Sequence, residues 1–153
     1  MPTYIKKEEI EKYINYEIKP TKWHQVTQAQ IDQFADCTLD HQFIHVDPEQ
    51  AKQTMYGTTI AHGFLSLSML SHFAEEFSLL IEGFYMGLNA GFDKVRFIHP
   101  VKVNSKVRAC AKVLKIEESK PGQFRFITEI TIEIENEEKP ALIAEWVSVQ
   151  IVK

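Results

Sequence analysis

Asp40 and His45 are the two residues whose types are best suited to acid–base chemistry. Both lie in the stretch 39–48, which reads LDHQFIHVDP. On an ideal helix, five positions correspond to about 140° of rotation, so the two side chains would not share a face. In a loop they can converge, and a carboxylate and an imidazole that hold one water between them can act as an acid–base pair. The structural alternative is that Asp40 caps a turn and His45 bonds a backbone carbonyl.

A second group of candidate residues lies at the start of a long apolar stretch. Gly63 would occupy the first turn of a helix, where N–H groups are unpaired and carry a positive partial charge. Its N–H could polarise a substrate carbonyl, or the glycine could simply permit close packing. Ser71, two turns further on, needs a hydrogen-bond partner, which is either a carbonyl one turn earlier or an active-site residue. We interpret His62 as a structural or loop histidine rather than a catalytic one.

Metal and anion sites are weaker candidates. His41 and His45 have the i, i+4 spacing with which histidine pairs bind zinc on helices. The segment is predicted to be a loop and no further ligand cluster is evident, so we expect no metal. Lys94 and Arg96 precede Pro100, where a strand would leave the core, and are the best candidates to bind phosphates.

Composition places the chain among ordinary globular proteins. It has 153 residues, 44% of them hydrophobic, and a net charge of −4, which predicts one domain over residues 1–153 and gives no basic footprint for nucleic acid. The N-terminus lacks the apolar core of a signal peptide, and the most apolar segment is too polar to span a membrane. Cys37 and Cys110 have no metal or redox spacing. We therefore expect a cytoplasmic protein without membrane contact.

Four helices are predicted in the first half of the chain. Thr27 and Gln30 form a capping box before an amphipathic segment. Asp47 and Pro48 provide a second start signal, so the residues between the two helices, 38–46, must form a loop. The longest helix, beginning at Gly63, is apolar nearly all round and should be buried. The expected helices cover residues 6–15, 28–37, 48–56 and 63–80.

The second half of the chain alternates apolar and polar residues with period two, which is typical of strands. Helices followed by consecutive strands indicate an α+β fold. A curved antiparallel sheet around one long buried helix is the hot-dog arrangement. Its open edge requires covering or pairing, and a homodimer that joins edges is the expected solution. The expected strands lie within residues 84–98, 101–113, 124–134 and 142–152.

Three motifs together resemble one known family. Residues 40–48 (DHQFIHVDP), 60–64 (IAHGF) and 89–97 (NAGFDKVRF) resemble the MaoC-like dehydratases, which include the R-specific enoyl-CoA hydratases (hydratase 2). The similarity runs from about Trp23 to Val149, and the branch resembling nodulation protein N is the nearest. Leu39 stands where the wider hydratase pattern has glycine, which takes backbone angles that leucine resists.

The resemblance implies a hot-dog homodimer with an acyl-CoA tunnel near the subunit interface. It implies reversible addition of water to trans-2-enoyl-CoA to give R-3-hydroxyacyl-CoA, with no cofactor beyond the coenzyme A of the substrate. The family's catalytic Asp falls on Asp40, its His on His45, the polarising backbone N–H on Gly63 and a supporting serine on Ser71. We expect further substrate contacts from Gln42, His62, Phe64, Asn89, Lys94 and Arg96.

In this hypothesis Asp40 and His45 hold one water. His45 takes a proton as the water attacks C3, and Asp40 helps to deliver a proton to C2. The division of roles stays open, because a coupled pair titrates as a unit. Two rivals are a hot-dog acyl-CoA thioesterase and a non-catalytic acyl-thioester binding module. His45 beside Asp40 favours hydration, whereas Leu39 favours the binding module.

Overall fold

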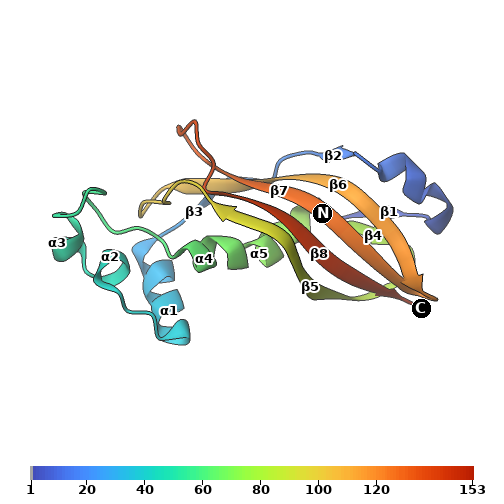
Figure 1. Cartoon of the computed structure of the whole chain (residues 1–153), viewed down its shortest axis with the longest axis horizontal. Helices are drawn as coiled ribbons and strands as arrows, with labels where there is room; N and C mark the ends of the chain where they lie inside the picture. Colours follow the sequence, from blue (N-terminus) through green and yellow to red (C-terminus); the bar gives the residue numbers. More distant parts are fainter. Residues whose placement is uncertain (1) are drawn as a thin grey trace.

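A six-stranded antiparallel sheet curls around two consecutive helices (Figure 1). The computed structural model describes residues 2–153. The strand order is β2-β6-β7-β8-β5, and β3 also pairs with β6. Inward-facing residues alternate with outward-facing ones along β7, as the period-two pattern predicts. The strands are β2 (Glu17–Ile18), β3 (His24–Gln25), β5 (Phe84–Phe97), β6 (Lys106–Lys120), β7 (Gln123–Ile134) and β8 (Leu142–Val152).

Helices α4 (Gly63–Ser68) and α5 (Leu70–Phe77) replace the single long helix that was predicted. Met69 separates them with a ψ of −11°, near the 3₁₀ range, although the hydrogen bond from its N–H to the Leu65 carbonyl continues the turn. The prediction of burial nearly all round was wrong for α4, where Phe64 and Ser68 are exposed. Leu65, Met69, Leu70, Phe73 and Phe77 do pack into the main core against the sheet. The fold is thus the predicted α+β hot-dog arrangement.

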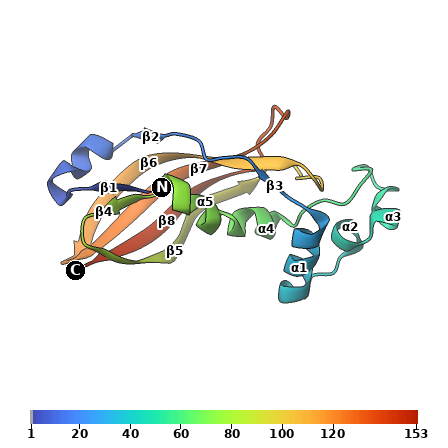
Figure 2. The ribbon, with the colours of Figure 1, turned by 180° about the vertical axis from the view of Figure 1, so that it is seen from behind.

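Three short helices extend beyond one end of the sheet (Figure 2). They are α1 (Gln28–Thr38), α2 (Phe43–Val46) and α3 (Pro48–Ala51). Both predicted N-caps are confirmed: the Thr27 hydroxyl accepts from the Gln30 N–H, and the Asp47 carboxylate accepts from the Gln50 N–H. The reciprocal half of the capping box is not formed, because the Gln30 side chain contacts His24 and Met69 instead. Two predictions were wrong. Residues 38–46 are not all loop, because α2 fits within them, and the third helix ends at Ala51 rather than near Tyr56.

The N-terminal segment closes the opposite end of the sheet. Strand β1 (Thr3–Ile5) pairs in parallel with β4 (Leu79–Ile81), and a 3₁₀ helix, η1 (Lys7–Tyr13), stands where the first helix was predicted. A second, smaller apolar cluster lies here and includes Ile5, Ile81 and Phe124. Among the described residues, no helix is both long and apolar enough to cross a bilayer.

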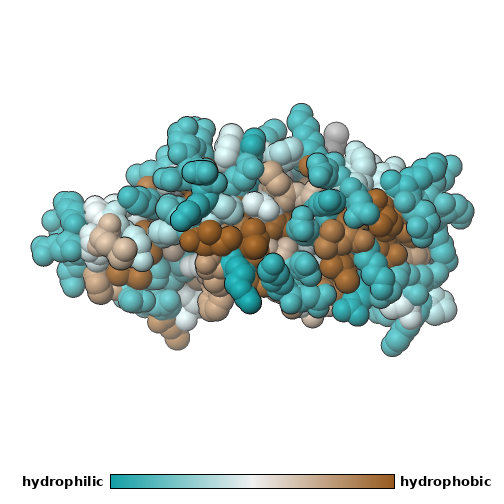
Figure 3. Space-filling model, turned by 45° about the horizontal axis from the view of Figure 1, so that its top comes forward, coloured by the Kyte–Doolittle hydropathy of each residue, from teal (hydrophilic) through white to brown (hydrophobic). Residues whose placement is uncertain are grey.

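Strand β5 forms one edge of the sheet, because it pairs only with β8. Apolar surface is also gathered on the face seen in Figure 3, between hydrophilic side chains. An edge of 14 residues with exposed apolar groups presents unpaired backbone to any other strand. Its exposed large apolar residues are Tyr85, Met86, Leu88, Phe92 and Phe97.

Candidate active site

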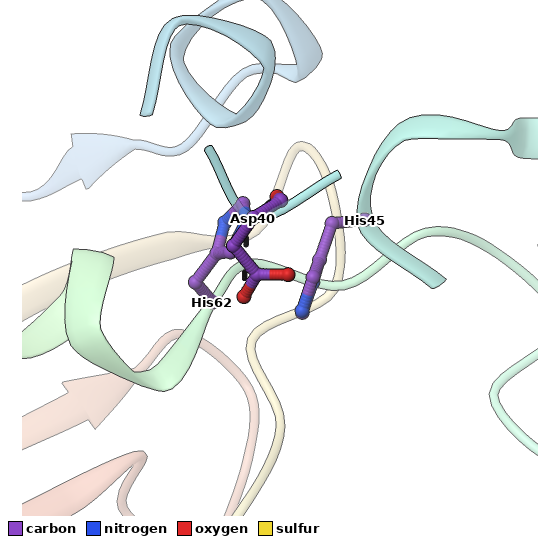
Figure 4. Close-up of side chains that lie close together, drawn as sticks. All are labelled: Asp40, His45 and His62. Carbon is purple, nitrogen blue, oxygen red and sulfur yellow. Dashed lines mark hydrogen bonds and ion pairs between the residues drawn. The ribbon is translucent and has the colours of Figure 1, made fainter. Parts of the chain in front are cut away.

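Asp40, which follows α1, His45 on α2, and His62, just before α4, lie close together (Figure 4). One carboxylate oxygen of Asp40 and one ring nitrogen of each histidine lie within 4.8 Å of one another. The Asp40 side chain is 54% exposed, whereas both histidines are buried. Asp40 and His45 therefore do converge, although His45 stands on α2 and not in a loop.

Leu39 ends α1 and directs the chain into Asp40. It adopts the left-handed conformation, with φ 64° and ψ 19°, at the C-cap of the helix. This is a conformation that glycine takes without strain and that leucine resists, so Leu39 adopts backbone angles suited to glycine. The Gln42 N–H then donates to Asp40 Oδ1 (3.3 Å), which closes a local turn. Leucine at this position thus does not displace Asp40 from the site.

One ring nitrogen of His45 forms a hydrogen bond within the described residues, and the other does not. Its Nδ1 lies 2.6 Å from the Ile60 carbonyl oxygen, and a carbonyl can only accept, so Nδ1 carries the proton and Nε2 keeps its lone pair. Burial lowers the pKa of the His45 imidazole below its ordinary value, and nearby His62 acts in the same direction. The Ile60 carbonyl and the Asp40 carboxylate oppose this shift without reversing it. A neutral ring with a free Nε2 is a competent general base.

His62 is a member of this cluster that the sequence analysis treated as structural or substrate-binding. Its Nε2 donates to the Asp40 backbone carbonyl (3.0 Å), and its ring stacks on that of His45. Phe34 packs against the other side, with ring centroids 4.9 Å apart. His62 Nδ1 is buried and has no hydrogen-bond partner among the described residues. The residue holds both Asp40 and His45 in place.

Gln28 and Thr59 support α2 through its backbone, and no pattern in the sequence identified either residue. Gln28 Nε2 donates to the His45 carbonyl (2.7 Å), and the Thr59 hydroxyl donates to Gln28 Oε1 (2.5 Å). The Ile60 N–H also donates to the Ile44 carbonyl (3.0 Å). The two side-chain bonds are part-buried, and they hold the backbone that carries His45.

A cavity of about 270 Å³ opens beside His45. Gly63 lies on its wall, and a Cβ added there would come within 3.1 Å of the Phe97 ring, so the glycine permits close packing. Phe64, at the rim, is exposed and packs edge-on against Phe97. The cavity is lined by His45, Ile60, Ala61, Gly63, Ser66, Phe97, Ile98, His99, Pro100, Val101 and Ala141.

Four of the predicted site residues lie elsewhere in this chain. Ser71 and Asn89 line a different cavity of about 200 Å³, between α5 and the sheet. Lys94 lines a shallow pocket with Glu129 and Glu145, whose carboxylates oppose anion binding there. The exposed Arg96 guanidinium donates to the Val95 carbonyl (2.8 Å). Sequence spacing could not show these positions, because they depend on how α5 and β5 run across the sheet.

The histidine pair is poorly arranged for a metal. An imidazole binds a metal through a lone pair in the plane of its ring. The rings of His45 and His62 are stacked, with centroids 3.8 Å apart and planes inclined by 23°, so their planes do not meet near the two nitrogens. His41, the other half of the i, i+4 pair, instead contacts Asp36 at 2.8 Å.

Similar proteins were found by sequence. A profile for the MaoC like domain matches residues 9–134. Nodulation protein N of Rhizobium leguminosarum bv. viciae is 46% identical over 139 residues, which cover 89% of this chain and 85% of that protein. The 3-hydroxyacyl-thioester dehydratase Z of Mycobacterium tuberculosis is 42% identical over 123 residues, which cover 80% of this chain and 81% of that protein.

Solved structures agree on the fold. The MaoC-like dehydratase from Rhodospirillum rubrum matches with a TM-score of 0.73 at 18% identity, over 92% of this chain and 93% of that one. The (R)-hydratase from A. caviae matches with a TM-score of 0.70 at 23% identity, over 86% of this chain and 93% of that one. The profile covers most of the chain and two relatives exceed 40% identity, so the protein belongs to the MaoC-like dehydratase family.

Proposed function

We propose that this chain is a hydratase that reversibly adds water to a trans-2-enoyl-CoA to give an R-3-hydroxyacyl-CoA. The observation that carries the proposal is the approach of an Asp40 oxygen and a His45 ring nitrogen to within 4.8 Å, beside a cavity. One water with two hydrogen bonds of about 2.8 Å bridges such a gap. The dehydratase relative at 42% identity supports the reaction class.

In the proposed reaction the water oxygen forms a bond to C3 of the enoyl group. One proton of the water passes to His45 Nε2, and the C2–C3 π electrons move toward the thioester carbonyl. The Gly63 N–H stabilises the negative charge on that oxygen. The Asp40–His45 pair returns one proton to C2, so it ends in its starting protonation state. These steps require no metal or redox cofactor.

The proposed active form is a homodimer paired through β5. Its long open edge and exposed apolar residues favour pairing with a second copy. A two-fold axis across antiparallel β5 strands would bring the Phe97 end of one copy toward the Phe84 end of the other. Phe84 and Asn89 line the cavity that also contains Ser71. An acyl chain could then extend from one catalytic cavity into the cavity of the other copy.

The test measures the loss of enoyl-thioester absorbance after the protein is mixed with a short trans-2-enoyl-CoA. We expect Asp40→Asn and His45→Ala each to lower kcat by about 100-fold or more, the range for a lost acid–base group. Asp36→Asn and His41→Ala are matched controls, because this exposed pair lies nearby but outside the cluster. Turnover that survives both active-site substitutions would refute the mechanism.

A thiol-reactive dye separates hydration from thioester cleavage, because only cleavage releases free coenzyme A. Binding of acyl-CoA without turnover would instead identify a binding module. The left-handed Leu39 removes the sequence feature that favoured this last alternative.

A further inference from the structure

Ser66 is a mostly buried residue whose side chain lines the cavity beside His45. It is only 6% exposed and lines the same cavity as His45 and Gly63. It follows Gly63 by three residues on α4, so the two lie on one side of the helix, one turn apart. The Ser66 hydroxyl forms no hydrogen bond within residues 2–153, and it is not one of their fully buried unpaired atoms, so its oxygen reaches the open space of the cavity.

The usual partner of a helical hydroxyl does not explain Ser66. Serine and threonine on helices commonly bond the carbonyl one turn earlier, as Thr38 does to Phe34 (2.7 Å). One turn before Ser66, the His62 carbonyl already accepts from the N–H groups of Leu65 (3.0 Å) and Ser66 (3.3 Å). The hydroxyl does not add a third bond to that carbonyl and is left for a ligand in the cavity.

We propose that the Ser66 hydroxyl donates a hydrogen bond to the thioester carbonyl oxygen of the substrate. This rests on the proposed hydratase function and adds a side-chain donor to the site. As water adds to C3, negative charge grows on the thioester oxygen, and a donor held in a buried cavity stabilises that charge more than it stabilises the neutral carbonyl. The hydroxyl keeps its proton throughout, so no bond of Ser66 forms or breaks.

The neighbouring serines do not share this position. Ser68 is on the same helix but faces solvent, and Ser71 lines the cavity beneath α5. Ser66→Ala is therefore the test variant, Ser66→Thr the conservative variant that keeps the hydroxyl, and Ser68→Ala the control. We expect Ser66→Ala to lower kcat on the order of 100-fold, with a small change in KM, because the bond strengthens in the transition state. Ser66→Thr should recover most of kcat.

Two further measurements separate this role from a packing role. Removing a hydroxyl that has no partner among the described residues should leave the Tm of Ser66→Ala equal to or above that of the wild type. A saturated acyl-CoA labelled with ¹³C at the carbonyl should show a lower infrared stretching frequency when bound to the wild type than in water. This shift should shrink in Ser66→Ala and persist in Ser66→Thr and Ser68→Ala.

Wild-type kcat and an unchanged carbonyl band in Ser66→Ala would overturn the proposal. So would a loss of kcat that parallels a fall in Tm and that Ser66→Thr does not recover. A wild type that binds acyl-CoA but does not hydrate enoyl-CoA would refute the proposed function instead. In that case the carbonyl band alone still decides whether Ser66 contacts the thioester.

Discussion

The imidazole rings of His45 and His62 are stacked, with centroids 3.8 Å apart. Each ring also donates one N–H to a backbone carbonyl, His45 to Ile60 and His62 to Asp40. These bonds fix opposite tautomers, with Nδ1–H in His45 and Nε2–H in His62. Burial, and to a smaller degree the nearby His62, lowers the pKa of the His45 imidazole. The pair thus connects the backbone of Asp40 to the ring of His45, the proposed general base.

This relationship predicts the effects of substituting His62. His62→Phe keeps an aromatic ring against His45 but loses the donor to Asp40, and His62→Ala loses both. We expect kcat to fall about 10-fold in His62→Phe and further in His62→Ala, with KM nearly unchanged. The acid limb of the rate profile should also move to higher pH in His62→Phe, because His62 contributes to lowering the pKa of the His45 imidazole. Identical profiles in all three proteins would contradict a positioning role.

The pH dependence follows from His45. Its ordinary pKa is about 6.5, and burial lowers the pKa in the folded protein, so the neutral base persists below that pH. We expect kcat/KM for hydration to stay level as the pH falls through 6.5 and to decline only below it. The same shift predicts how stability depends on pH. Below about pH 6.5 the His45 side chain binds a proton more readily in the unfolded chain than in the folded protein, so the free energy of unfolding falls. An acid limb centred above 6.5 would contradict the assignment.

Local signals in the sequence predicted much of the fold. The Thr27–Gln30 and Asp47–Gln50 caps involve residues three apart, so the chain alone specifies them. Strand alternation is equally local. The break at Met69 and the early end of α3 were missed, because each depends on a backbone angle and not on a residue pattern.

The site was only partly predictable, for a different reason. Asp40 and His45 are close in sequence, but Gln28 reaches His45 across 17 residues and His62 reaches Asp40 across 22. Only the packed arrangement of α1, α2 and α4 brings these partners together. Ser71, the serine that the resemblance implied, lines a different cavity from His45 for the same reason. An apolar helix sequence does not show which serine faces the site until the sheet covers the other side.

Leu39 should limit stability without limiting activity. A leucine in the left-handed region costs roughly 1–2 kcal/mol of stability, and glycine avoids this cost. Glycine loses about half of that gain, because its unfolded chain has more conformational entropy. Because Leu39 is 82% exposed, little burial is lost. We expect Leu39→Gly to raise the free energy of unfolding by about 1 kcal/mol in urea titrations. Asn136→Gly, at φ 64°, is the control with a smaller gain, because asparagine tolerates this region. A less stable Leu39→Gly would mean that the leucine contacts a second copy.

Gln28 should matter to both stability and catalysis. Gln28→Leu keeps the bulk of the side chain but leaves the His45 carbonyl and the Thr59 hydroxyl without partners. We expect the free energy of unfolding to fall by about 2 kcal/mol and kcat to fall with it, since α2 loses its support. Gln25→Leu is a control of the same chemistry at an exposed position, where the amide only contacts the Asn104 carbonyl. Chemical denaturation and steady-state kinetics at a temperature well below both transitions separate the two effects.

The open edge of β5 predicts how the oligomer should respond to charge. Leu88 lies on this strand and is half exposed, so Leu88→Lys would place a cation where two edges are proposed to meet. We expect sedimentation to show twice the 17.7 kDa chain mass for the wild type and dissociation toward the single chain mass for Leu88→Lys. Tyr16→Lys, beside β2 at the opposite edge, is the control and should leave the mass unchanged.

Hydratase activity should fall with dissociation and recover at high protein concentration, because the acyl chain is proposed to occupy the second copy. A monomeric wild type with full activity would exclude this shared site.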